Sequence, residues 1–114
     1  MPEEELDVAV LGTVLEDDCA RTILEATVRE PKSADELVAE CEVSRATVYR
    51  RLDDLEEHAL LSVRQHPDAE GHHYKVYVAA LDRVVVDLTP QGMELSLRRR
   101  DQMTERLRRF IEGL

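Results

Sequence analysis

Residues 33–58 read SADELVAECEVSRATVYRRLDDLEEH, and this stretch decides the fold that the sequence predicts. Ser33 and Glu36 stand three residues apart in the order of a capping box, which predicts the start of a short helix. After a break near Val43, Ser44 can cap a second, longer helix. That helix carries an apolar stripe at i, i+4 and i+7, formed by Val48, Leu52 and Leu55. Two helices joined by a short turn, with Val43 holding the turn in place, predict a helix-turn-helix.

The face opposite this stripe changes in character along the second helix. Its first half is small, hydroxylic and cationic, because residues 44–51 hold Arg45, Arg50 and Arg51 and no acidic residue. Its second half is acidic and carries Asp53, Asp54 and Glu57. Because a recognition helix enters the major groove with its N-terminal residues, this polarity favours DNA reading. The alternative is a plain helical domain in which Arg50 pairs with Asp54 one turn away.

The motif and its flanks resemble the winged-helix transcription regulators, nearest the arsenic-repressor-like (ArsR-type) group as it appears in halophilic archaea. The specific phrases are SRATVYRRLDDLE at residues 44–56 and GHHYKVY at residues 71–77, and the resemblance covers about residues 11–80. It implies a homodimeric repressor or activator that binds double-stranded DNA, with a base-reading helix at residues 44–58 and a wing around Gly71. Metal-sensing members carry paired cysteines on the first helix of the motif, whereas this chain has only Cys41 there.

Helices and strands are predicted on both sides of the motif. Apolar residues at helical spacing predict two helices before it, the second capped by Asp17 or Asp18 and ended by Pro31. After the motif, a strand from Leu61, a turn cluster at residues 67–71 and a return strand over residues 73–79 predict a β-hairpin. Residues 83–88 predict a third, short strand.

This predicted wing carries four cationic or titratable residues near its tip, namely Arg64, His72, His73 and Lys75. They could reach backbone phosphates or the minor groove. Asp68 and Glu70 lie at the same tip and would repel phosphate. The wing therefore predicts weaker DNA contacts than the helix does.

Residues 89–112 are predicted to form one long helix, because Thr89 can cap it and Pro90 suits its first position. At 1.5 Å per residue the helix would be about 36 Å long. Its predicted interface residues are apolar, namely Met93, Leu97, Met103, Leu107, Phe110, Ile111 and Leu114. One small domain leaves little to cover such a stripe, so a symmetric partner helix in a homodimer is expected. The alternative is packing against the first helices of the same chain.

The composition contradicts the usual basic footprint of a nucleic-acid binder. The 114-residue chain has a formal net charge of −10 and a pI near 4.8, and its only lysines are Lys32 and Lys75. An acidic, lysine-poor but periodic sequence suggests a folded domain from a cytoplasm with high salt, rather than a disordered one. Residues 1–18 hold seven acidic residues and no cation, so the acid is kept away from the proposed reading helix.

No catalytic, metal or cofactor site is predicted. Cys19 and Cys41 are too few and too far apart in sequence for a disulfide framework or a CxxC pair, so each is expected to be a small buried hydrophobe. The four histidines lack zinc-finger spacing. No phosphate loop, nucleophile elbow, signal peptide or transmembrane span is recognisable, which predicts a cytoplasmic protein that is not an enzyme.

These patterns and the resemblance together predict an α+β fold. A winged helix-turn-helix, mainly helical with a β-hairpin wing, would occupy residues 1–88, and a long C-terminal dimerisation helix residues 89–114. The predicted function is sequence-specific transcription regulation by a homodimer on a roughly palindromic DNA operator. Its predicted DNA contacts are Ser44, Arg45, Ala46, Thr47, Tyr49, Arg50, Arg51, Arg64, His72, His73 and Lys75. The alternative is a winged-helix module that binds proteins of the transcription machinery and has no DNA affinity.

Overall fold

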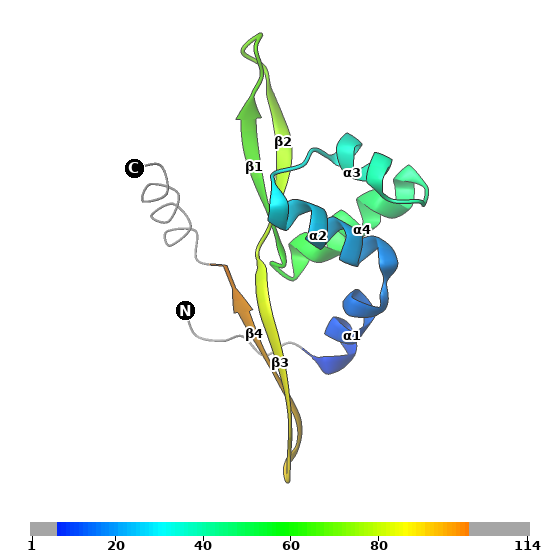
Figure 1. Cartoon of the computed structure of the whole chain (residues 1–114), viewed down its shortest axis with the longest axis vertical. Helices are drawn as coiled ribbons and strands as arrows, with labels where there is room; N and C mark the ends of the chain where they lie inside the picture. The colour runs from blue at the N-terminus through cyan, green and yellow to red at the C-terminus, as the bar shows by residue number, and fades with distance from the viewer. Residues whose placement is uncertain (1–6, 101–114) are drawn as a thin grey trace.

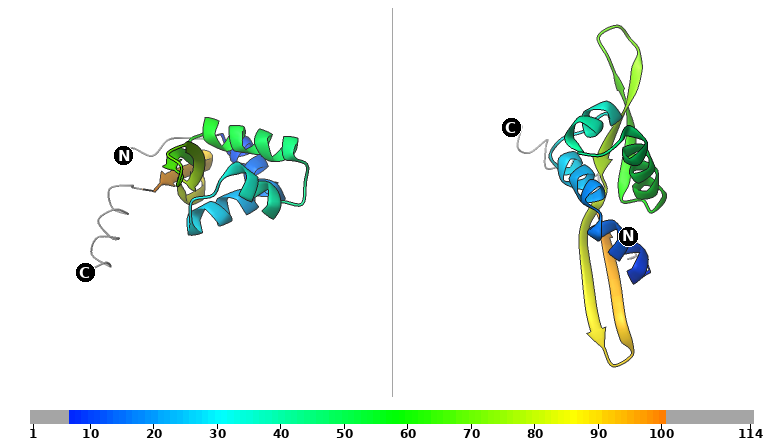
Figure 2. Two further views of the ribbon diagram at one scale, coloured as in Figure 1. Left: turned by 90° about the horizontal axis from the view of Figure 1, so that it is seen from above. Right: turned by 90° about the vertical axis from the view of Figure 1, so that its right-hand side faces the viewer.

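The computed structural model describes residues 7–100, which form an α+β arrangement of helices followed by two β-hairpins (Figure 1). The helices are α1 (Val8–Glu16), α2 (Asp18–Arg29), α3 (Ala34–Glu40) and α4 (Arg45–Glu57). The strands are β1 (Leu61–Pro67), β2 (His73–Ala79), β3 (Leu81–Thr89) and β4 (Gly92–Arg99). The hairpins β1–β2 and β3–β4 are both antiparallel, and they extend in opposite directions from the helical body (Figures 1 and 2).

The helix starts follow the predicted capping residues. The Ser33 hydroxyl accepts from the Glu36 amide at 3.2 Å, and the Glu36 carboxylate accepts from the Ser33 amide at 3.0 Å, so the capping box is confirmed. Ser44 caps α4 by accepting from the Thr47 amide. Of the two candidates before α2, Asp17 is the cap. These side chains satisfy amides that have no partner within the first turn of a helix.

One core joins the helices to the bases of both hairpins. Its fully buried members include Leu11, Ile23, Leu37, Val48, Leu52, Leu55 and Leu60. The predicted stripe of α4 is thus buried. Val43 was expected to hold the turn between α3 and α4, but it is 45% exposed, and Leu37 and Cys41 are the residues that enter the core there.

The β1–β2 hairpin confirms the predicted strands that follow the helix-turn-helix. Its register pairs Leu61 with Ala79 and Pro67 with His73. Lys32, in the link between α2 and α3, makes two backbone hydrogen bonds with Tyr77 of β2 (3.1 and 2.7 Å) and adds a short third strand segment. Helices α2 to α4, this bridge and the hairpin fit a winged helix.

The chain leaves α4 through a left-handed residue. Ala59 has a φ of 55°, its amide donates to the Glu56 carbonyl at 3.0 Å, and the next amide, of Leu60, donates to Leu55 at 2.8 Å. This is the hydrogen-bond pattern of a Schellman motif, which satisfies the last carbonyls of a helix. The buried Leu60 then leads directly into β1.

The predicted C-terminal helix is wrong over its first half. Thr89 and Gly92 face each other as the last pair of the β3–β4 hairpin, and Pro90 lies in its turn. Met93 and Leu97, assigned above to a helical dimer stripe, lie in strand β4. The remaining residues of that stripe, Met103, Leu107, Phe110, Ile111 and Leu114, lie outside the described residues.

Candidate nucleic-acid interface

The first half of α4 carries the side chains that are predicted from the sequence to read bases. Ala46, Tyr49 and Arg50 are exposed, and Tyr49 is 41% exposed, while Thr47 is half-buried. Ser44 at the cap is also exposed, and its hydroxyl lies 2.9 Å from the Thr47 hydroxyl. The buried stripe of α4 anchors the helix to α2 and α3, so these outward side chains stand on a rigid element.

Arg45 is exposed but not unpartnered. Its guanidinium donates to the carboxylate of Asp35, in the first turn of α3, at 2.7 Å. It also lies over the Tyr49 ring at 6.0 Å from the ring centre, a cation–π contact. Arg45 would therefore have to exchange Asp35 for a phosphate in order to act as a DNA contact.

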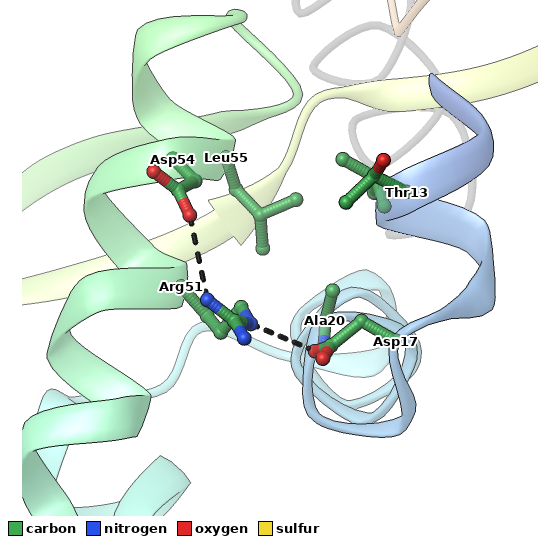
Figure 3. A pocket seen from close by; sticks show the side chains of 7 residues that line it. Thr13, Asp17, Ala20, Arg51, Asp54 and Leu55 are labelled. Atoms are coloured by element: carbon green, nitrogen blue, oxygen red, sulfur yellow. Dashed lines mark hydrogen bonds and ion pairs between the residues drawn. The ribbon is translucent and has the colours of Figure 1, made fainter. Parts of the chain in front are cut away.

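Arg51, predicted to contact phosphate, instead lies among carboxylates of the protein. Its side chain is only 28% exposed and lies 3.0 Å from the Asp17 carboxylate and 3.6 Å from that of Asp54. Figure 3 shows it reaching from α4 towards the start of α2, at the edge of a pocket of about 90 Å³. That volume is well below the ~300 Å³ of small ligand sites. Through its ion pair with Asp17, Arg51 joins α4 to the α1–α2 junction.

Arg50 is the cation of α4 that remains available. It is exposed and makes no ion pair with any residue of the described part of the chain. Asp54, which could have paired with it one turn away, instead faces Arg51. The alternative in which Arg50 simply pairs with Asp54 is therefore not what the structure shows.

The tip of the wing is built by an acidic residue. The carboxylate of Asp68 accepts from the amides of Glu70 (2.9 Å) and His72 (2.8 Å), while the Asp68 amide donates to the His72 carbonyl at 2.7 Å. Gly71 takes a φ of +83°, which favours glycine. The predicted contacts His72, His73 and Lys75 are exposed along this hairpin, and Arg64 is half-buried. Asp68 therefore stabilises the turn at the tip through these hydrogen bonds.

Sequence patterns gave no sign of Arg99 as a partner of α4. Its guanidinium donates to the carbonyls of Ala59 at 2.8 Å and His58 at 2.9 Å, at the C-terminal end of that helix. A cation there complements the helix dipole. Arg99 thus ties the base of the β3–β4 hairpin to the helix that carries the candidate DNA contacts.

Cys19 and Cys41 are buried, as predicted, and they also meet. Their sulfur atoms lie 3.6 Å apart between α2 and the end of α3. Burial and the neighbouring thiol raise the pKa of Cys19 to about 12, and burial also raises the pKa of Cys41. Such thiols are largely protonated at neutral pH and react slowly.

Residues 7–100 also bear on metal binding and on membrane insertion. No group of three or more His, Cys, Asp or Glu side chains gathers there in a way that could hold a metal ion. No helix in the same range is long and apolar enough to cross a membrane.

The helix-turn-helix and most of the wing lie within a region that matches a known protein family. No curated protein sequence is significantly similar to the chain. A family model described as the HVO_A0261 N-terminal domain matches residues 8–76, from α1 into strand β2, and so includes the helix-turn-helix and most of the wing. Because the match spans more than half of the 114 residues, the chain belongs to the HVO_A0261 N-terminal domain family.

Proposed function

We propose that the protein is a sequence-specific regulator of transcription that binds double-stranded DNA as a homodimer in a high-salt cytoplasm. The finer likeness to ArsR-type regulators, which rests on the sequence phrases quoted above, belongs to this proposal. The α4 helix would read bases in the major groove, and the β1–β2 wing would contact the backbone beside it.

The observation that carries the proposal is the distribution of charge on α4. Arg45 and Arg50 are exposed on its first two turns, which contain no carboxylate, whereas its exposed acidic residues, Asp53, Glu56 and Glu57, follow later. A recognition helix needs this order, because its N-terminal part enters the groove and its C-terminal part leaves it. Tyr49 and Thr47 add groups that can contact base edges and thymine methyls.

The ion pairs separate the three arginines of α4 into three cases. Arg50 has no carboxylate partner among residues 7–100, so it can approach guanine without losing an existing bond. Arg45 would trade Asp35 for phosphate, an exchange of similar bonds that adds little net affinity. Arg51 is left out of the proposed interface, because Asp17 and Asp54 hold it inside.

A second candidate is a winged-helix module that binds other proteins and not DNA. The net charge of −10 and the ion pair between Asp35 and Arg45 favour the protein-binding module, since both reduce attraction to phosphates. The exposed Arg50 at the acid-free end of α4 favours DNA. The two candidates differ in one measurable property, which is affinity for a preferred duplex over a random one.

The test is selection of binding sequences from a random duplex library in molar potassium chloride, followed by fluorescence anisotropy with the selected duplex and a scrambled one. Arg50→Ala should weaken binding to the selected duplex by ~1–3 kcal/mol, or about 5- to 150-fold, and relax the preferred sequence. Arg29→Ala removes the same charge from the exposed end of α2, outside the proposed interface, and should leave the preference unchanged.

Two outcomes would count against the proposal. If folded protein selects no sequence at all, the protein-binding module becomes the better candidate. If Arg50→Ala lowers affinity for selected and scrambled duplexes equally, Arg50 binds phosphate and another residue must read the bases.

A further inference from the structure

The β3–β4 hairpin has one wholly apolar face, and only half of it is covered. The register places three apolar pairs on this face, namely Val84 with Leu97, Val86 with Leu95, and Leu88 with Met93. Near the base, Leu95 and Leu97 are buried in the core. Towards the tip, Val86, Leu88 and Met93 are 51%, 81% and 56% exposed. The hairpin extends beyond the helical body (Figure 1), and the apolar residues near its tip are the exposed ones.

The other face of the same hairpin pairs like charges. Arg83 lies directly opposite Arg98, and Asp87 lies directly opposite Glu94. All four are exposed, and none makes an ion pair with another residue in the described range. Like charges directly opposite each other destabilise a hairpin. Each hairpin therefore carries a basic pair near its base and an acidic pair near its tip, four residues apart along the strand.

The outer edge of β3 is not paired with another strand of the described chain. Residues 83–88 read RVVVDL, with three consecutive β-branched valines between the charged Arg83 and Asp87 and no proline, so the edge can pair only with a strand that complements these two charges. Among residues 7–100, the backbone hydrogen bonds of this segment join it only to β4. A hairpin of two strands is marginal by itself, so a further strand would stabilise it.

Helix α1 adds a second uncovered apolar surface close to the base of this hairpin. Its sequence, VAVLGTVLE, contains no charged residue before Glu16, although 35% of the chain is charged. Only Leu11 and Val14 are buried, while Val8 and Leu15 are 36% and 41% exposed. A helix that is apolar on all sides normally lies inside a protein or an assembly.

We propose that β3 pairs antiparallel with β3 of a second copy about a two-fold axis near Val85, which joins the two hairpins into a four-stranded sheet. The proposal rests on the homodimer of the proposed function and names its interface. In this register, Arg83 of each chain lies opposite Asp87 of the other, twice in the dimer. The same alignment sets Val84 beside Val86 on the apolar face.

A second copy fits this edge because the hairpin has a basic pair at one end and an acidic pair at the other, so two antiparallel copies complement each other in charge. Antiparallel alignment brings the basic end of one hairpin to the acidic end of the other, which relieves the like-charge pairs in both. In the same register Leu88 of each chain lies opposite Asp82 at the base of the other hairpin, and Arg100 lies 3.8 Å from the carboxylate of this Asp82 within its own chain. Two chains of −10 charge repel each other, so an uncharged contact surface flanked by opposite charges favours their association.

The test measures association of the full-length protein without DNA, by sedimentation equilibrium at 0.2 and 2 M potassium chloride. Asp87→Arg would set like charges opposite each other at both ends of the interface and should raise the dimer dissociation constant about tenfold at the lower salt. Glu94→Arg makes the same charge change on the directly opposite residue of β4 and should change the constant less than threefold. Adding Arg83→Asp to Asp87→Arg should restore dimerisation.

The outcomes separate this interface from its alternatives. Because no DNA is present, loss of dimerisation and loss of DNA reading are measured independently. A wild-type protein that is monomeric at all concentrations overturns the proposal and leaves residues 101–114 of the same chain as the cover of the apolar face. If Glu94→Arg weakens dimerisation as much as Asp87→Arg does, or if the double variant does not regain dimerisation, then the dimer contact does not lie along β3 in this register. Circular dichroism verifies folding, and Arg83→Asp, which makes the same repulsion, replaces Asp87→Arg if the latter unfolds.

Discussion

Asp17 stabilises three elements at once, so its replacement should have an unusually large effect for a partly exposed residue. Its amide ends α1 by donating to Val14 at 3.2 Å, and its carboxylate caps α2 by accepting from Ala20 at 2.8 Å. The same carboxylate lies 3.0 Å from Arg51 of α4, with both side chains a little over one-quarter exposed. Asp17→Ala loses the cap, about 1 kcal/mol, and the ion pair, about 1 kcal/mol. We expect the free energy of unfolding to fall by about 2 kcal/mol and Tm by roughly 10 °C.

Asp17→Asn separates the two contributions. The amide oxygen of asparagine can still cap α2, so this variant should lose only about 1 kcal/mol, which belongs to the charge. Arg51→Ala should remove the same contribution, and the double variant should lose less than the sum of the singles. Because salt screens the pair but not the cap, the loss in Asp17→Asn should shrink between 0.2 and 2 M potassium chloride.

The pH dependence of stability gives an independent check that the charged form of Asp17 stabilises the fold. Burial raises the pKa of Asp17, but the Ala20 amide and Arg51 together outweigh it and lower the pKa below the ordinary 3.8. The folded protein thus holds this proton less tightly than the unfolded chain does, so the contribution is present above about pH 4 and lost as pH falls through the folded pKa. Asp17→Asn should flatten this part of the stability curve.

Urea denaturation followed by circular dichroism measures the free energies of unfolding, and thermal unfolding measures Tm. A loss below 0.5 kcal/mol for Asp17→Ala, against the ~2 kcal/mol expected from capping and pairing, would refute the reasoning. An equal loss for Asp17→Asn and Asp17→Ala would show that charge alone matters and that capping does not.

The remaining predictions concern the end of α4, the thiols and salt. Ala59→Gly should raise the free energy of unfolding by about 0.5–1 kcal/mol, because the φ of 55° is strained for alanine, and a lower urea midpoint would contradict this. Native protein should resist iodoacetamide at pH 8, whereas urea-unfolded protein should take up label at Cys19 and Cys41; rapid native labelling, read by mass spectrometry, would contradict their burial and the pKa of about 12 for Cys19. DNA affinity should depend weakly on potassium chloride or increase with it, and a steep decrease would count against the few phosphate contacts proposed.

The local signals of the sequence predicted the central motif well. The capping box at Ser33 and the cap at Ser44 are confirmed, as is the buried stripe of α4, because capping and amphipathic spacing are decided within a few residues. The wing strands are confirmed for the same reason, since alternation and turn residues define a hairpin locally. The third strand begins at Leu81, two residues before the predicted start.

Strand β4 was assigned to a helix because its signals fit two periods. Met93 and Leu97 are four residues apart, a spacing that fits one face of a helix and also one face of a strand. Leu95 between them, buried on the same face, is the residue that only a strand explains. Thr89 followed by proline can start a helix, but proline with Gly92 two residues later is also typical of a β-turn.

Contacts between elements could not be predicted, and they change how the candidate interface is interpreted. From the sequence, Arg45, Arg50 and Arg51 form one cationic cluster, yet the fold brings Asp35 from α3 to Arg45 and Asp17 from the α1–α2 junction to Arg51. Of the three arginines of α4, only Arg50 has no carboxylate partner among residues 7–100. If the protein binds DNA as proposed, an α4 helix with one unpaired cation gains little from counterion release, so sequence preference would have to come from hydrogen bonds and shape, which salt weakens least. High salt would then oppose the proposed DNA contact little and would screen the repulsion between two acidic chains, so the proposed dimerisation and the proposed DNA binding are compatible under the same conditions.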